Sequence, residues 1–256
     1  MYFSAEHLAL ANQAVCETFG QCSIVWQAIP HWATGDPGQI SVPNGILATP
    51  GLIPVVTKDE TVQLTLGQAL APTPDALLTG VMTATKVLAK DVDNDVLPNL
   101  YKGATSNLTT AVTAQPLQDT LIKARATVED AGYRAPSCVV TNTVGLTKLN
   151  QLVTGSSTSI YGQLITAANI NSIYRSQPLD PPDAKTRLVF IGRRQRIPQG
   201  AAPEASPGEE PVDLAVSLLP SLEVDGETNT GKIQLTVRIR YATRITDATG
   251  LVAIQN

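Results

Sequence analysis

The segment between residues 29 and 56 constrains the fold of this chain more than any other, because proline and glycine interrupt it so often. The interruptions are Pro30, Gly35, Pro37, Gly38, Pro43, Gly45, Pro50, Gly51 and Pro54. Proline removes a backbone donor and glycine favours turns, so no long helix can form here. Directly afterwards, Val62, Leu64 and Leu66 alternate with polar residues, which predicts a strand with one buried face.

We therefore expect an extended loop over about residues 40–68, containing a hairpin whose turn is Thr57–Glu60. A loop of this length is unusual inside a compact domain. It is easier to explain if the loop packs on a neighbouring copy of the chain. The loop residues that we select as candidates for contacts between subunits are Ile53, Val55, Lys58, Asp59 and Glu60.

A long amphipathic helix is predicted next, from Pro74 to Leu97. Thr73 is suited to cap its N-terminus, and Pro98 is expected to end it. The apolar stripe of this helix consists of Leu77, Val81, Ala84, Leu88, Val92 and Val96. The helix is about twice as long as the mean of roughly 11 to 12 residues in globular proteins.

The remaining sequence alternates between helical and extended patterns. Helices are expected near residues 5–28, with Ser4 as the N-cap, and at 116–131, 144–153 and 160–173. Gly132 is expected to close the second of these helices, and Asn142 to cap the third. Strands are expected at 137–141, 187–192, 212–219 and 232–245, with connecting loops at 103–114, 154–159 and 198–211, and the segment 251–254 closes the chain. The strand at 232–245 is the most regular, because its odd positions from 233 to 241 are apolar and its even positions from 232 to 240 are polar. This order of elements predicts an α+β fold.

The composition argues against several functions. Charged residues make up only 16% of the 256 residues, and the net charge is −4, which is opposite in sign to that of most DNA-binding proteins. The low charge fits a surface that meets other copies of the chain. The three cysteines form no CxxC pair, which favours a reducing compartment. No signal peptide or membrane-spanning stretch is evident, so we expect assembly in a cytoplasm and no membrane partner.

Motifs for catalysis or metal binding are weak. His7, Cys16, Cys22 and His31 do not have the spacing of common zinc ligands. Cys138 could serve as the nucleophile of a hydrolase, but it lies in an apolar run where a small buried residue is the simpler explanation. The sequence has no GxSxG elbow, phosphate loop or dinucleotide fingerprint. We therefore predict no enzyme activity and assign no catalytic, cofactor-binding or metal-binding residues.

The densest positive cluster contains Arg193, Arg194 and Arg196. It could contact nucleic acid, but no aromatic residues are interleaved to stack on bases. Ion pairs between subunits are the favoured interpretation, with Glu204, Glu209 and Glu210 as acidic partners. Arg238, Arg240 and Arg244 share the polar face of the strand at 232–245, and we select Arg238 and Arg240 as further contact candidates. A solvent-facing strand surface is the alternative for these arginines.

Taken together, the order of elements resembles the Hong Kong ninety-seven fold of tailed-bacteriophage major capsid proteins and the related encapsulins. The loop at 40–68 resembles the E-loop of that family, and the helix at 74–97 resembles its spine helix. The stretch from Leu117 to Leu149, with Ala131–Pro136 between a helix and a strand, resembles the opening of the axial domain. Val237–Asp247 resembles the closing strand.

The resemblance implies an N-terminal segment at 1–35, an extended loop at 36–70, a peripheral domain at 71–114 and 211–256, and an axial domain at 115–210. It implies a structural subunit that forms pentamers and hexamers of an icosahedral virion capsid, assembled in the host cytoplasm around double-stranded DNA bound without sequence specificity. Portal, scaffolding or decoration proteins would be further partners. The alternative is an encapsulin-like nanocompartment that encloses a cargo enzyme. Some family members crosslink a lysine to an asparagine, but we assign no such pair here.

Overall fold

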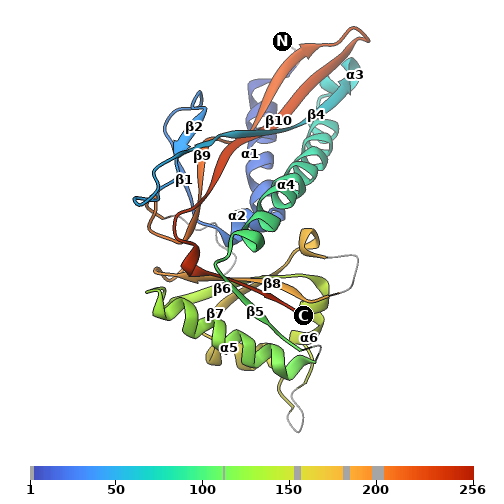
Figure 1. The fold of residues 1–256 in the computed structure, drawn as a ribbon. Coiled ribbons are helices and arrows are strands. Elements are labelled where there is room, and N and C mark those ends of the chain that lie inside the picture. The colour runs from blue at the N-terminus through green and yellow to red at the C-terminus, as the bar shows by residue number, and fades with distance from the viewer. Residues whose placement is uncertain (1–2, 112, 153–156, 181–184, 198–204) are drawn as a thin grey trace.

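The computed structural model describes residues 3–111, 113–152, 157–180, 185–197 and 205–256. Within them lie a four-stranded sheet, a five-stranded sheet and a small two-stranded hairpin. The long helix α4 packs along the four-stranded sheet and leads toward the five-stranded sheet (Figure 1).

The N-terminal helix α1 spans Ala5–Cys22, and a short helix α2, Ile24–Ala28, follows it. The Oγ atom of Ser4 accepts a hydrogen bond from the backbone N–H of His7 at 3.0 Å, which confirms Ser4 as the N-cap. Ala11, Val15 and Phe19 are buried, as their helical spacing predicts. Ser23 ends α1 and caps α2, so the single helix expected near 5–28 is divided in two.

The four-stranded sheet has the order β1-β9-β10-β4. These strands span His31–Ala33, Val212–Glu227, Lys232–Ile245 and Val56–Thr65, respectively. The two-faced pattern of β10 is confirmed, because its odd-numbered apolar residues face α1 and α4 in the core. Those residues are Ile233, Leu235, Val237, Ile239 and Tyr241.

The turn predicted at Thr57–Glu60 is wrong. These residues lie inside β4, where Lys58, Asp59 and Glu60 are opposite Ile239, Arg238 and Val237 of β10. Pairing with β10 gives the β4 backbone its hydrogen bonds, and the side chains alternate between exposed Thr57 and Asp59 and half-buried Lys58 and Glu60, so no turn is needed. The hairpin of this region lies earlier, where β2, Ser41–Pro43, pairs with β3, Leu52–Pro54. After β4, Thr65 caps the short helix α3, Leu66–Ala69.

Helix α4 spans Asp75–Gly103, so it does not end at Pro98 as expected. Proline removes the donor for the carbonyl of Asn94, but Asn94 is exposed and water can satisfy that carbonyl. Leu100 is fully buried after the proline, so tertiary packing favours the helical continuation. Pro74 is the N-cap residue, and Thr73 does not cap the backbone but donates from its hydroxyl to Asp75.

The five-stranded sheet has the order β5-β11-β8-β6-β7. These strands span Ser106–Thr109, Leu251–Gln255, Arg187–Arg193, Ala135–Thr141 and Ile170–Arg175. The region 103–114 therefore contains a strand where only a connector was expected, because β5 adds to β11 in parallel. The strands β5 and β11 belong to the segments 71–114 and 211–256, which the resemblance assigns to the peripheral domain. They nevertheless join the same sheet as β6, β7 and β8, which lie within 115–210.

Three helices accompany this sheet: α5, Ala114–Asp130; α6, Thr143–Leu149; and α7, Ile160–Ala167. Gly132 follows α5 with a positive φ of 93°, and Asn142 caps α6 by accepting from the N–H of Gly145, as predicted. The helix expected over 160–173 ends early. Asn169 adopts a positive φ of 48°, and its carbonyl accepts from Ser137, so the chain turns into β7.

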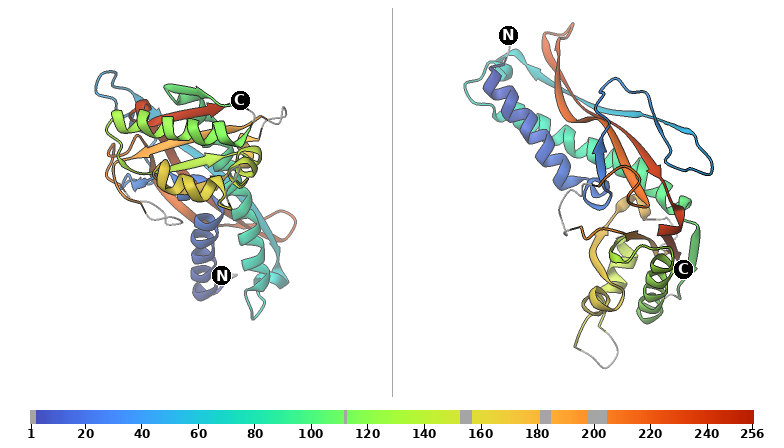
Figure 2. Two further views of the ribbon diagram at one scale, coloured as in Figure 1. Left: turned by 90° about the horizontal axis from the view of Figure 1, so that it is seen from below. Right: turned by 90° about the vertical axis from the view of Figure 1, so that its left-hand side faces the viewer.

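The core lies in two layers. The larger cluster fills the space between α1, α4 and the four-stranded sheet, and continues onto one face of the five-stranded sheet through Cys138, Val140 and Val189. The smaller cluster lies on the other face, under α5 and α7, and includes Leu121, Leu164 and Phe190. Seen from below, these helices cover that face (Figure 2). Two single turns, Gln177–Leu179 and Ala248–Gly250, complete the regular structure of the described residues.

Candidate assembly surface

The most exposed apolar side chains lie on the segment 36–55, which we call the arm. Ile40, Leu47 and Leu52 are 77%, 97% and 72% exposed, respectively. The arm follows the left-hand side of the molecule in Figure 1, beside the four-stranded sheet. Neighbouring apolar side chains exposed to this extent are typical of surfaces that another protein covers. These three residues are not among the contact candidates selected from the sequence, although each lies in a short stretch between glycine or proline residues.

The base of the arm packs on its own chain. Val42 is fully buried against Ala215 of β9 and Ala242 of β10. The predicted contact residues Ile53 and Val55 are half-buried in the same cluster, so part of each side chain is already used within the subunit.

The tip of the arm is organised by Asn44. Its side-chain amide donates to the carbonyl of Thr49 at 2.8 Å, and its side-chain oxygen accepts from the N–H groups of Ile46 and Gly51. Gly45 has a φ of +75°, and a Cβ atom at this position would lie 2.9 Å from Thr246. The tip is therefore a defined turn that presents Leu47 outward.

Two arginines of β10 reach the backbone of the arm. Arg240 donates to the carbonyl of Pro37, and also to that of Gln39 at 3.1 Å. Arg244 donates to the carbonyl of Pro43 at 3.1 Å. The structure thus places Arg240, a predicted contact between subunits, in contacts within the subunit.

Arg244 is itself held by a buried ion pair. Its Nε and Nη2 atoms donate to the two carboxylate oxygens of Asp213 at 2.7 and 2.6 Å, and its guanidinium lies 4.8 Å from the ring centre of Trp32. Planar guanidinium groups suit this combination of bidentate pairing and stacking. The side chain consequently has one orientation, directed at Pro43.

Two other charged candidates on this sheet, Lys58 and Arg238, also have partners in their own chain. The ammonium group of Lys58 lies 3.8 Å from the carboxylate of Asp95 on α4. Arg238 forms an ion pair with Glu223 of β9. Asp59 is exposed and Glu60 is half-buried, and both remain candidates for contacts with a neighbour.

The basic run after β8 does not act as one surface. Arg193 is only 1% exposed and donates to the carbonyl of Ala28, so the prediction that it contacts a neighbouring subunit is wrong. It points inward because its position continues the buried face of β8.

Arg194 is exposed, but its guanidinium donates to the carbonyl of Glu209 and to the hydroxyl of Tyr133. Glu210, one of the predicted acidic partners, is buried and accepts from the backbone N–H groups of Arg194 and Gln195. Burial raises the pKa of Glu210 above its usual value, and these N–H groups oppose that effect. The basic run and the acidic loop thus contact each other within one chain through hydrogen bonds to backbone groups, while the ion pairs expected between subunits stay a prediction. Glu204 lies outside the described residues.

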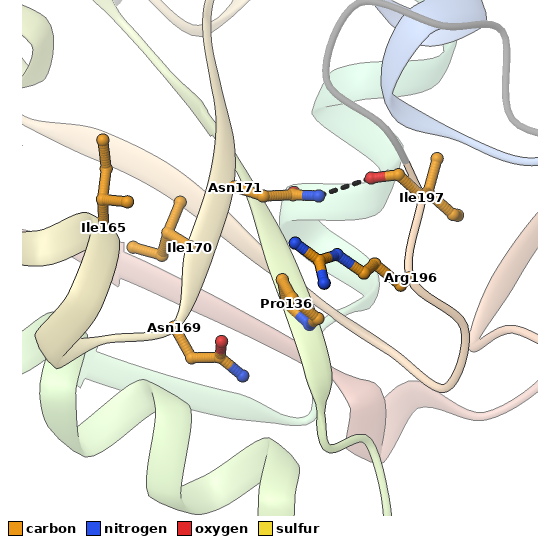
Figure 3. A pocket seen from close by; sticks show the side chains of 7 residues that line it. All are labelled: Pro136, Ile165, Asn169, Ile170, Asn171, Arg196 and Ile197. Carbon is orange, nitrogen blue, oxygen red and sulfur yellow. Dashed lines mark hydrogen bonds between the residues drawn. The ribbon is translucent and has the colours of Figure 1, made fainter.

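Arg196 lines a cavity of about 540 Å³. Figure 3 shows its guanidinium directed toward Pro136 on β6, with Ile165, Ile170 and Asn171 on the other side of the cavity. The side-chain amide of Asn171 donates to the carbonyl of Ile197 and joins β7 to the segment after β8. Arg196 is itself exposed, so its guanidinium is available to a partner.

The alternatives based on catalysis and metal binding find no support in the geometry. Cys138 is fully buried, and burial raises the pKa of its thiol to about 11, so the nucleophilic thiolate is scarce at neutral pH. Cys16 donates to the carbonyl of Pro220, and His31 stacks on Trp26 with ring centres 3.9 Å apart. Among the described ranges, no three histidine, cysteine or acidic residues gather in a group suited to a metal ion.

A second groove, of about 380 Å³, lies between α1 and the strands β1 and β9. Its lining includes Asn12, Cys16, Ala33 and Leu219.

In the portion of the chain that the structure describes, no helix combines the length and the apolar character needed to span a bilayer.

Comparison with known proteins identifies the fold. No protein-family model and no curated protein sequence matches this chain. The solved virus-like particle from Pyrococcus furiosus superposes with a TM-score of 0.74 at 13% identity, over 98% of each chain. The capsid of Myoviridae phage XM1 gives a TM-score of 0.52 at 14% identity over 92% of each chain. The holo-SrpI encapsulin complex from Synechococcus elongatus gives 0.56 at 12% identity, over 91% of this chain and 87% of that one.

These matches cover nearly the whole chain, so the chain has the α+β Hong Kong ninety-seven fold that phage capsid and encapsulin shells share. The resemblance inferred from the order of elements is confirmed at the level of the fold.

Proposed function

We propose that this protein is a structural subunit that assembles with copies of itself into a closed icosahedral shell, and that it is not an enzyme. The observation that carries the proposal is the arm, whose tip is ordered within the subunit while Leu47 and its apolar neighbours remain uncovered. Burying these side chains on a neighbouring copy would supply a favourable free energy of about 25 cal/mol per Å². The fold supports the same conclusion, since the matched solved structures include a capsid and a virus-like particle.

In the finer form of this proposal, the shell is a phage capsid of pentamers and hexamers that forms in the host cytoplasm and encloses double-stranded DNA. The four-stranded sheet and α4 would belong to the peripheral domain, and the five-stranded sheet to the axial domain, with β5 and β11 crossing into the latter. Asp59, Glu60 and Arg196 are the charged candidates that stay accessible to a neighbour. Portal, scaffolding or decoration proteins would be additional partners.

The second candidate function is a nanocompartment that encloses a cargo enzyme. It is favoured by the virus-like particle from Pyrococcus furiosus, which matches over 98% of both chains with a TM-score of 0.74, against 0.52 for the capsid of Myoviridae phage XM1. Particles purified from the native source distinguish the two: a phage capsid yields double-stranded DNA protected from nuclease, and a nanocompartment yields a second protein by mass spectrometry.

The assembly itself is tested with purified full-length chain by size-exclusion chromatography and negative-stain electron microscopy. We expect closed shells for the unmodified chain, and Leu47→Ser should raise the concentration needed for assembly more than about tenfold, because each copy loses roughly 1.5 to 3 kcal/mol of burial. Ala48→Ser is the matched control, because it adds the same hydroxyl one residue away but removes little apolar surface. A chain that stays monomeric at high concentration would contradict the proposal.

A further inference from the structure

We propose that Arg240 and Arg244 are positioning residues that hold the arm in the direction in which it meets a neighbouring copy of this chain. The inference rests on the proposed shell function and concerns residues that do not themselves form the apolar contact. It starts from an asymmetry within β10, whose even-numbered face is polar and free near Lys232 but is covered by the base of the arm near Ala242.

In the contacts that the two arginines make with the arm, all three acceptors are backbone carbonyls. Arg240 spans the carbonyls of Pro37 and Gln39 with two nitrogen atoms, and Arg244 reaches that of Pro43. Such contacts fix the path of the arm backbone and do not depend on which side chains the arm carries. A guanidinium suits this task better than an ammonium group, because its planar fork can serve two carbonyls at a fixed separation.

The other contacts at the base of the arm are a short hairpin and an apolar cluster. The hairpin β2–β3 pairs three residues on each strand, the N–H of Val55 donates to the carbonyl of Ile40 at 2.9 Å, and Val42 is buried. An isolated two-stranded hairpin is marginally stable in water. The arginines therefore act together with the apolar packing of Val42, Ile53 and Val55 to fix the arm relative to the sheet.

The orientation of the arginines is determined before any neighbour arrives. Arg244 is fixed by both carboxylate oxygens of Asp213 and by the ring of Trp32. Asp213 also accepts from the backbone N–H of Gly208. A segment that is ordered before binding loses less conformational entropy when it binds. The arm can thus present Leu47 and Leu52 to a second copy at a low entropic cost.

The experiment compares Arg240→Ala with the unmodified full-length chain. Below the assembly concentration, hydrogen exchange at the Val55 amide should be faster in the variant, because the base of the arm is released. The concentration for half-assembly should rise by about tenfold, the factor that corresponds to roughly one charge-assisted hydrogen bond. Lys232→Ala, on the same face of the same strand but far from the arm, should change neither measurement.

The outcomes separate this inference from the proposed function. If the unmodified chain assembles and Arg240→Ala assembles equally well, the inference is wrong and the proposed function stands. If the unmodified chain remains monomeric, the proposed function falls, and the inference with it. If Arg240→Ala reduces the yield of folded chain, Arg240→Gln is used, because it retains a shorter donor and most of the apolar stem. Normal assembly of that variant with a released arm would likewise contradict the inference.

Discussion

Asp93 is a buried carboxylate that fixes the N-terminal helices to α4. Its Oδ1 atom accepts from the hydroxyl of Ser23 at 2.9 Å and from the N–H of Val25 at 3.0 Å, and its Oδ2 atom accepts from the N–H of Ile24 at 3.0 Å. A residue of α4 therefore accepts hydrogen bonds from the free N–H groups at the start of α2. Burial nevertheless raises the pKa of Asp93 to about 6, because desolvation outweighs the three hydrogen bonds.

This shift predicts how stability depends on pH. The ordinary pKa of the group is 3.8, so the folded state binds a proton more readily than the unfolded state, and the stabilising contribution is lost as the pH rises through about 6. Relative to Asp93→Asn, which does not titrate, the unmodified chain should gain about 1 kcal/mol of unfolding free energy between pH 7 and pH 5. Urea unfolding at both pH values measures this difference. Parallel changes in the two proteins would contradict the raised pKa.

At the scale of elements, α4 shows how tertiary packing overrides a local signal. Pro98 marks a helix end by its chemistry, yet the helix continues to Gly103 and buries Leu100. The side chain of Asn99 donates to the carbonyl of Asp95 at 2.7 Å, which offsets part of the disturbed hydrogen bonding around the proline.

We expect Pro98→Ala to stabilise the subunit by about 1 kcal/mol. The substitution restores a donor for the carbonyl of Asn94 and removes the clash of the ring, and the greater freedom of the unfolded chain offsets part of this gain. Chemical denaturation of Pro98→Ala measures the change. The control is Asn99→Ala, which leaves the backbone donors intact. A loss of stability in Pro98→Ala would mean that the proline serves the packing of the helix end.

At the scale of the whole molecule, assembly through an apolar arm should follow the thermodynamics of hydrophobic burial. Such burial weakens on cooling and strengthens in sulfate. We therefore expect fewer shells at 4 °C than at 25 °C and more shells when ammonium sulfate is added, measured by light scattering at fixed protein concentration. Assembly driven by ion pairs such as those expected for the basic run would instead weaken with added salt. Weaker assembly in added salt would mean that the main contact between copies does not involve Leu47 and its apolar neighbours.

The residues of the candidate assembly surface could be predicted only in part from the sequence. The proline-rich segment correctly indicated a loop, but the selected residues Ile53 and Val55 are half-buried, while Leu47 is the most exposed. Arg193, Arg194 and Arg196 look equivalent in the sequence, yet one is buried, one is bonded to its own chain and one faces a cavity. The exposure of a side chain depends on the direction of the backbone and on what packs above it, which no local pattern specifies.

The sequence by itself determined the elements whose signal repeats along the chain. The alternation of β10, the stripe of α4 and the caps at Ser4 and Asn142 follow from backbone periodicity and local hydrogen bonding. Only the tertiary structure decided that Thr57–Glu60 belongs to a strand, that β5 and β11 join the second sheet, and that the arm is fastened by Arg240 and Arg244. These outcomes depend on partners far away in the sequence, whose contacts outweigh the weak local preferences of the residues concerned.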